Sequence, residues 1–104
     1  MELFGFTSSA GPLPIITHAD YTLVGPVGAG LTPAKPSETV IAWGTGDCST
    51  PSVTVGGAPS TVAFSGRVAP GLCQINFLVP NSPAGSNQLK MSTSPNLYSL
   101  WVSP

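Results

Sequence analysis

Hydrophobic and polar residues alternate with a period of two in several short segments of the chain. The clearest segment runs from Leu72 to Val79, between Pro70-Gly71 and Pro80. Such alternation, with turn residues at both ends, predicts a β-strand with one buried face. The residues on its apolar face are Cys73, Ile75, Phe77 and Val79. We therefore expect Cys73 and Phe77 in the core.

Similar segments recur at a spacing of about ten residues. The other predicted strands are Ile15–His18, Tyr21–Val24, Glu38–Trp43, Ser52–Val55, Thr61–Phe64, Gln88–Thr93 and Leu97–Val102. Gly56-Gly57 is expected to join Ser52–Val55 and Thr61–Phe64 as a hairpin, because Gly-Gly between β-branched runs favours a tight turn. The last two segments are expected to form a pair. Trp43, in the middle of its strand, is expected in the core.

Short strands without any helical periodicity are typical of a β-sandwich. The 104 residues suffice for one domain, which we expect to span residues 1–104. Residues 1–36 supply N-terminal strands and a loop rich in Gly and Pro, and residues 37–104 supply the core. The Gly-rich stretch Gly25–Gly30 lacks the Gly-Lys-Ser/Thr ending of a phosphate loop and is expected to be a connection.

Charge is scarce: three Lys and Arg residues stand against four Asp and Glu residues, and charged residues make up 7% of the chain. Three basic residues cannot neutralise a phosphate backbone, so we expect no nucleic-acid partner. No apolar run is long enough to span a membrane. The start of the chain lacks a secretory signal, so an extracellular protein would be a processed or excised piece of a longer one.

Two cysteines, Cys48 and Cys73, lie far apart in the sequence and outside any CxxC motif. With the single His18 they are too few for a zinc site. An even number of cysteines in a β-rich chain with little charge favours one Cys48–Cys73 disulfide and an oxidising, extracellular or cell-surface location. Two buried free thiols are the alternative.

Groups suited to catalysis are few and scattered. His18 and Asp20 share one face of a predicted strand, but no nucleophile motif accompanies them. Glu38 and Asp47 are the only plausible carboxylate pair, and each is expected to bond to nearby backbone instead. We therefore expect no enzymatic activity, no catalytic residue, no metal and no cofactor.

Aromatic and terminal residues provide two candidate interaction surfaces. Tyr21, Trp43, Tyr98 and Trp101 are candidates for a platform that stacks on sugar rings, with Trp101 the best candidate for an exposed contact. Both ends of the chain are apolar, and a surface with little charge favours strand exchange between copies of the protein. The candidate assembly contacts are Leu3, Phe4, Phe6, Leu97, Tyr98, Leu100, Trp101 and Val102.

The stretch from Pro36 to Gly85 resembles a known family. Its phrases include Trp43-Gly44-Thr45-Gly46, Val53-Thr54-Val55-Gly56-Gly57-Ala58-Pro59 and Ala69-Pro70-Gly71-Leu72-Cys73-Gln74-Ile75-Asn76-Phe77. Their order and spacing are similar to the Solibacter-type C-terminal domain, an uncharacterised module of large secreted and surface proteins in Acidobacteria. The Val53–Pro59 phrase and the later Val79-Pro80 and Pro83-Ala84-Gly85 also resemble IPT/TIG-type immunoglobulin-like domains. In the commoner form of the family the loop before this strand is longer and lacks a cysteine. Here the loop is shorter and contains Cys48, which fits a disulfide in place of the longer loop.

Together these observations predict an all-β, immunoglobulin-like β-sandwich of about seven strands with one disulfide. We expect a non-catalytic extracellular structural or interaction module, such as the C-terminal domain of a secreted or surface protein. The partners expected are other protein domains, copies of itself, or a glycan. The alternatives are a subunit of a filament or surface array, and a carbohydrate-binding module.

Overall fold

The computed structural model describes residues 1–28 and 30–103, and within them the chain forms eleven β-strands and no helix. All the strand pairs are antiparallel. The all-β prediction is therefore confirmed, although the strand number exceeds the seven expected.

The first sheet is built around β5 and has five strands in the order β1-β5-β9-β8, with β4 also paired to β5. Its members are β1 (Glu2–Leu3), β4 (Ile16–Thr17), β5 (Thr39–Thr45), β8 (Val62–Ala69) and β9 (Leu72–Leu78). The β9 strand matches the segment that alternation predicted, and β5 matches the predicted strand that begins near Glu38.

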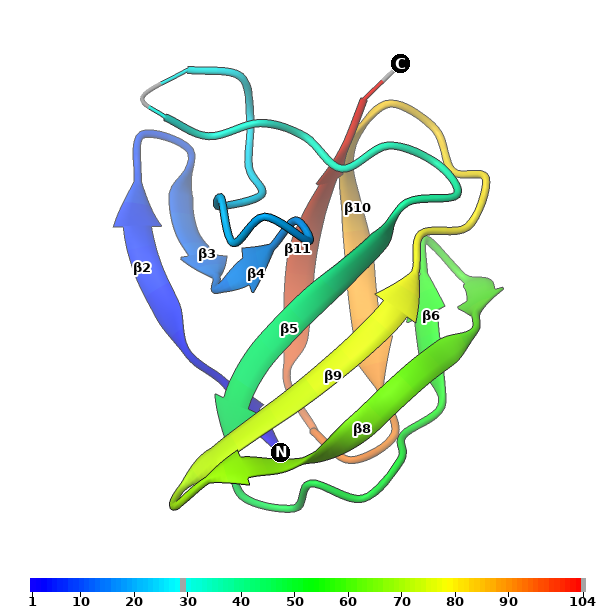
Figure 1. Ribbon diagram of the computed structural model, residues 1–104. Coiled ribbons are helices and arrows are strands. Elements are labelled where there is room, and N and C mark those ends of the chain that lie inside the picture. The colour runs from blue at the N-terminus through cyan, green and yellow to red at the C-terminus, as the bar shows by residue number, and fades with distance from the viewer. Residues whose placement is uncertain (29, 104) are drawn as a thin grey trace.

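The second sheet has four strands in the order β11-β10-β6-β7. Its members are β6 (Val53–Val55), β7 (Ala58–Ser60), β10 (Gly85–Met91) and β11 (Leu97–Val102). The β10–β11 pair confirms the predicted C-terminal hairpin. In an immunoglobulin-like sandwich, strands A, B, E and D form one sheet and strands G, F, C and C′ form the other. The two strand orders found here correspond to this arrangement, and Figure 1 shows β5, β9 and β8 in front of β10 and β11.

The core lies between the two sheets and is made by alternate residues of each strand. From the first sheet it receives Val40, Ala42, Ile75 and Phe77, all fully buried. From the second sheet it receives Val55, Leu89, Met91, Leu100 and Val102. The predicted inward face of β9 is confirmed, since Cys73, Ile75 and Phe77 have no exposed surface.

The extra strands come mainly from the N-terminal region. Strands β1 and β4 pair with the same edge of β5, one opposite Gly44 and Thr45 and the other opposite Ile41 and Ala42. Between them the chain makes a separate hairpin of β2 (Gly5–Ser8) and β3 (Gly11–Pro14). The first strand of the sandwich is therefore interrupted by a hairpin. The predicted strand Tyr21–Val24 is reduced to isolated bridges at Leu23 and Val24.

The hairpin predicted around Gly56-Gly57 exists, but its second strand is different. Strand β6 pairs with Ala58–Ser60, directly after the turn, in which Gly56 and Gly57 have φ values of 57° and 85°. Positive φ at both positions is what a two-residue type I′ turn requires. Thr61–Phe64, expected to pair with Ser52–Val55, instead leads into β8 and pairs with β9 across the sandwich.

The predicted disulfide joins Cys48 to Cys73, with the two Cα atoms 5.3 Å apart. Cys73 lies in β9 opposite Gly44 of β5, and Cys48 follows β5 in the chain. The bond therefore fastens the loop after β5 to its neighbouring strand within one sheet, rather than bridging the two sheets.

Candidate functional site

The outer face of the first sheet gathers aromatic and amide side chains from three neighbouring strands. Because Ile75 and Phe77 point into the core, Gln74 and Asn76 of β9 point outward. Opposite Gln74 lies Trp43 of β5, which shares its outward orientation. Trp43 is half-buried on this outer face and lies outside the core cluster, so its predicted core position is wrong.

Phe64 extends this row onto the third strand. It is paired with Asn76, so it faces outward, and 44% of its surface is exposed. Its ring lies over Gly66, where a Cβ atom would come within 3.3 Å of the Phe64 Cζ atom. Gly66 is in turn paired with Gln74. The absence of a side chain at Gly66 thus leaves room for the tip of the Phe64 ring.

The two amides are linked to each other. Gln74 Nε2 donates a hydrogen bond of 2.9 Å to Asn76 Oδ1. Within the described residues no protein group bonds to Gln74 Oε1 or to Asn76 Nδ2. The Gln74 Oε1 acceptor, the second Nε2 hydrogen of Gln74 and both Nδ2 hydrogens of Asn76 therefore remain available.

Tyr21 closes the row at its other end. Its ring centroid lies 6.2 Å from that of Trp43, and the two planes meet at 49°. Tyr21 is 69% exposed and has a φ of 67°, a left-handed conformation that is rare for an aromatic residue. We name these five residues the aromatic–amide face: Tyr21, Trp43, Phe64, Gln74 and Asn76.

The turn that carries Tyr21 is held by backbone hydrogen bonds and by the Asp20 carboxylate. The Tyr21 N–H donates to the His18 carbonyl oxygen at 2.9 Å, and the His18 N–H donates to Thr22 O at 2.9 Å. Asp20 accepts bonds from the Thr22 hydroxyl (2.6 Å) and N–H (3.1 Å), and these bonds hold the pKa of Asp20 below its usual value. Thr17, just before the turn, accepts a bond of 3.0 Å from the Trp43 indole N–H.

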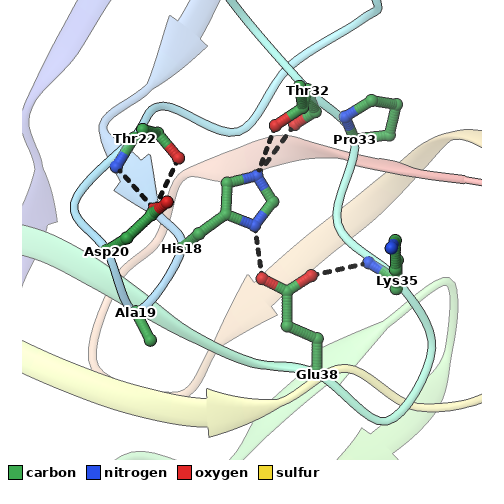
Figure 2. A pocket seen from close by; sticks show the side chains of 8 residues that line it. All are labelled: His18, Ala19, Asp20, Thr22, Thr32, Pro33, Lys35 and Glu38. Carbon is green, nitrogen blue, oxygen red and sulfur yellow. Dashed lines mark hydrogen bonds and ion pairs between the residues drawn. The ribbon is translucent and has the colours of Figure 1, made fainter.

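The His18 side chain anchors the same turn through bonds to Glu38 and Thr32 (Figure 2). Its Nδ1 is hydrogen-bonded to Glu38 Oε2, and its Nε2 lies 2.8 Å from Thr32 Oγ1. Glu38 also accepts a bond of 2.9 Å from the Lys35 N–H. The imidazole therefore joins three separate parts of the chain. These groups line an open pocket of about 530 Å³.

Thr32, His18 and Glu38 form a hydroxyl–imidazole–carboxylate relay, the order that nucleophilic hydrolases use. Such a reaction also needs paired N–H donors aimed at the developing oxyanion. Two backbone N–H groups of this pocket, those of Thr22 and Lys35, already donate to the carboxylates of Asp20 and Glu38. The bonds of His18 to Glu38 and Thr32 fix the turn, because these two partners lie on different segments of the chain.

The acidic residues bond to nearby backbone, as expected for Glu38 and Asp47, and neither the His18–Asp20 nor the Glu38–Asp47 pairing considered above forms among the described residues. Asp20 bonds to Thr22 rather than to His18, because the turn aims its carboxylate back at its own backbone. Glu38 and Asp47 flank opposite ends of β5, on the order of 20 Å apart. Asp47 accepts a bond of 2.9 Å from the Ser49 N–H, as expected for a turn aspartate, and this bond lowers its pKa.

The terminal segments that were candidates for assembly lie within the fold. Leu100 and Val102 are buried in the core of the sandwich, so they offer no surface to a second copy. Leu3, Phe4, Leu97 and Tyr98 line a single pocket of about 220 Å³, where the two ends of the chain meet. Phe4 and Leu97 are exposed there, by 40% and 56%. Phe6 and Trp101 are half-buried.

Residues 1–28 and 30–103 bring no three His, Cys, Asp or Glu side chains together as a metal site. The same residues contain no helix that could cross a membrane. Comparison of the chain with protein-family models, curated proteins and solved structures finds no match.

The aromatic–amide face was only partly visible in the sequence. Alternation in β9 already places Gln74 and Asn76 opposite the apolar face. Phe64 was missed because its strand was predicted to pair with Ser52–Val55 rather than with β9. The proximity of Tyr21 to Trp43 depends on a left-handed turn that no simple residue pattern signals.

Proposed function

We propose that this protein is a non-catalytic interaction module of an extracellular or cell-surface protein, and that it docks through the aromatic–amide face. The observation that carries the proposal is the concentration of three aromatic rings and two amides on one outer surface. The packing of the core does not need aromatic rings on this outer face, because the core cluster lies between the two sheets. Exposed aromatic residues are favoured where a surface binds a partner.

The disulfide supports the proposed location. Disulfides persist in oxidising compartments and are rare in reducing ones. The Cys48–Cys73 bond also closes a loop of the sheet that carries the face, and so stabilises it outside the cell. The resemblance to the Solibacter-type C-terminal domain agrees with a module attached to a larger secreted or surface protein.

The absence of catalysis is part of the proposal. His18 is the single histidine of the chain, and both ring nitrogens are engaged by Glu38 and Thr32. Its side chain is only 15% exposed. We assign it the role of a positioning residue that fixes the turn carrying Tyr21.

Assembly through terminal strands is a second candidate, supported by Phe4 and Leu97, which lie exposed near one another. Strands β1 and β11 are already paired within their own sheets, however. Strand exchange would first have to break those pairs, which makes this candidate weaker than docking through the face. A native mass of one chain, measured by light scattering in dilute buffer, would exclude it.

Co-sedimentation tests the proposed docking surface. Insoluble cell-envelope fragments of the organism that encodes the protein are mixed with the wild type, with a Tyr21→Ala/Phe64→Ala double variant, and with Trp101→Ala as the control on the other sheet. We expect the wild type and the control to be pelleted with the fragments and the double variant to stay in solution. Equal behaviour of all three proteins, whether pelleted or soluble, would overturn the proposal.

A further inference from the structure

We infer that the aromatic–amide face binds neutral carbohydrate, with sugar rings seated against Trp43 and Phe64 and their hydroxyl groups bonded to Gln74 and Asn76. This inference rests on the proposed function and names the chemical class of its ligand. It depends on the order of side chains across the sheet, on their unused hydrogen-bonding groups and on the lack of charge.

The order of the side chains suits a sugar chain lying across the strands. From β5 to β8 the row runs through Trp43, Gln74 and Gly66, and the Phe64 ring covers Gly66. Two strand spacings separate the aromatic positions, about 10 Å. A pyranose has apolar C–H faces, which pack on aromatic rings, and a rim of hydroxyl groups. An aromatic–amide–aromatic row offers both kinds of contact in sequence.

The amides supply the polar half of this recognition. Each sugar hydroxyl is both a donor and an acceptor. Gln74 Oε1 can accept from one hydroxyl, and Asn76 Nδ2 can donate to another, because the bond between the two amides uses the other end of each group. That bond also fixes both side chains before the ligand arrives, which reduces the entropy lost on binding.

The lack of charged side chains on the face argues against ionic ligands. Within β5, β8 and β9, all of which the structure describes, the outward residues that share the rungs of Gln74 and Asn76 are uncharged: Ile41, Trp43, Phe64 and Gly66. A phosphorylated or strongly acidic ligand would find no cation there. An apolar partner would leave the open amide groups buried without hydrogen-bond partners, which is unfavourable.

The left-handed backbone conformation of Tyr21 is an independent observation that supports a binding site on this face. A left-handed tyrosine is disfavoured, and unusual backbone of this kind is concentrated at functional sites. The turn is nevertheless fixed by His18 and Asp20, and it leaves 69% of the tyrosine exposed beside Trp43. The ring, inclined at 49° to Trp43, forms a wall at one end of the row. It adds a third contact for a sugar seated on the indole.

Affinity electrophoresis in native gels tests the inference. The probes are soluble neutral polysaccharides of different backbone: a mixed-linkage β-glucan, xylan, galactomannan and pullulan. We expect at least one of them to retard the wild-type protein. Tyr21→Ala and Phe64→Ala should each weaken that binding about tenfold. Both residues are exposed, so neither change should unfold the protein. Gln74→Leu, which keeps the size of the side chain but removes the amide, should weaken it severalfold.

Matched controls separate the site from the fold. Trp101→Ala removes an aromatic ring from the opposite sheet and should leave the retardation unchanged. Each variant should keep the far-UV circular dichroism of the wild type. A polyanion, polygalacturonate, should not retard the protein.

The outcomes distinguish this inference from the proposed function. Absence of retardation by all four neutral polysaccharides overturns the carbohydrate assignment, whether or not the envelope fragments retain the protein. If the fragments still retain the wild type and release the Tyr21→Ala/Phe64→Ala variant, the docking face survives with a different ligand. Retardation that Trp101→Ala abolishes and Phe64→Ala does not would move the carbohydrate site to the other sheet and overturn the inference.

Discussion

The two outer faces of the sandwich are built on similar antiparallel strands but carry different side chains. On the β10–β11 face, the outward pairs are Ser86 with Trp101, Gln88 with Ser99, and Lys90 with Leu97. This face therefore has one aromatic ring, opposed by a serine, and a charged lysine. The β5–β9–β8 face has Trp43 and Phe64 on adjacent rungs with two amides between them, and Tyr21 at its edge.

The difference indicates which features the fold demands and which it does not. Both sheets bury alternate apolar residues, because the sandwich needs a core. Only one sheet gathers aromatic residues on its solvent side, where packing has no need of them. His18 fixes the turn that presents Tyr21, and Gly66 leaves room beside it for the Phe64 ring. This asymmetry supports the proposed docking surface on the first sheet.

The largest expected effect comes from the core that keeps the two faces apart. Phe77 is fully buried, so Phe77→Ala should lower the free energy of unfolding by about 3 to 5 kcal/mol. Leu78→Ala, at the next position but on the outer side and 38% exposed, should change it by less than about 1 kcal/mol. Urea denaturation of the two variants checks this prediction. Similar losses for both would mean that β9 faces the core differently.

The disulfide belongs to one sheet, so its removal should weaken that sheet. The bond closes a loop with a sequence separation of 25. Loop-closure entropy predicts a loss of about 3.5 kcal/mol on reduction. The melting temperature should fall by roughly 15 °C for a domain of this size. A Cys48→Ser/Cys73→Ser variant should melt at the temperature of the reduced wild type. A melting temperature insensitive to reducing agent would contradict the bond.

Removal of the His18 side chain should disturb the aromatic–amide face alone. Without the bonds to Glu38 and Thr32, the turn loses its anchor, and we expect a loss of stability of about 1 to 2 kcal/mol. The near-UV circular dichroism of the Tyr21–Trp43 pair should weaken in His18→Ala. Asp47→Ala, at the far end of β5, is the control and should keep that signal. An unchanged spectrum for His18→Ala would show that the turn holds itself.

The smallest effect concerns acid. The bonds from the Thr22 hydroxyl and N–H hold the pKa of Asp20 below its usual value in the folded protein. A lowered folded-state pKa contributes stability above the unfolded value, and that contribution is lost as the pH falls through the folded value. The wild type should therefore melt above Asp20→Asn at about pH 6, and the difference should shrink at about pH 3. A difference that stays constant over this range would contradict the assignment.

Local patterns predicted the elements whose environment is regular. Alternation placed β9 correctly, and the even cysteine count favoured the disulfide found. The Gly56-Gly57 turn was identified, yet its partner strand was not, because a two-residue turn needs only the three residues Ala58–Ser60 to complete the hairpin. Pro59 disfavours a strand at these residues, so the β-branched run that follows them was predicted to be the partner.

Features that depend on distant pairing were beyond a reading of single segments. The β2–β3 hairpin contains Gly11 and two prolines, which are poor strand residues, and it forms because β1 and β4 hold its ends against β5. Trp43 was expected inside because it is large and lies in the middle of a strand. Its neighbours Val40 and Ala42 already fill the inward positions, and the period of two then directs it outward.

The two tryptophans of the chain lie one on each outer face, which permits a direct test of the central claim. A Trp101→Phe variant leaves Trp43 as the sole tryptophan, and Trp43→Phe leaves Trp101. Each variant is titrated with the polysaccharide that most retards the wild type, and the tryptophan emission is recorded. We predict that the emission of Trp43 shifts on binding while that of Trp101 stays constant. A response from Trp101 alone, or from neither tryptophan, would contradict the account.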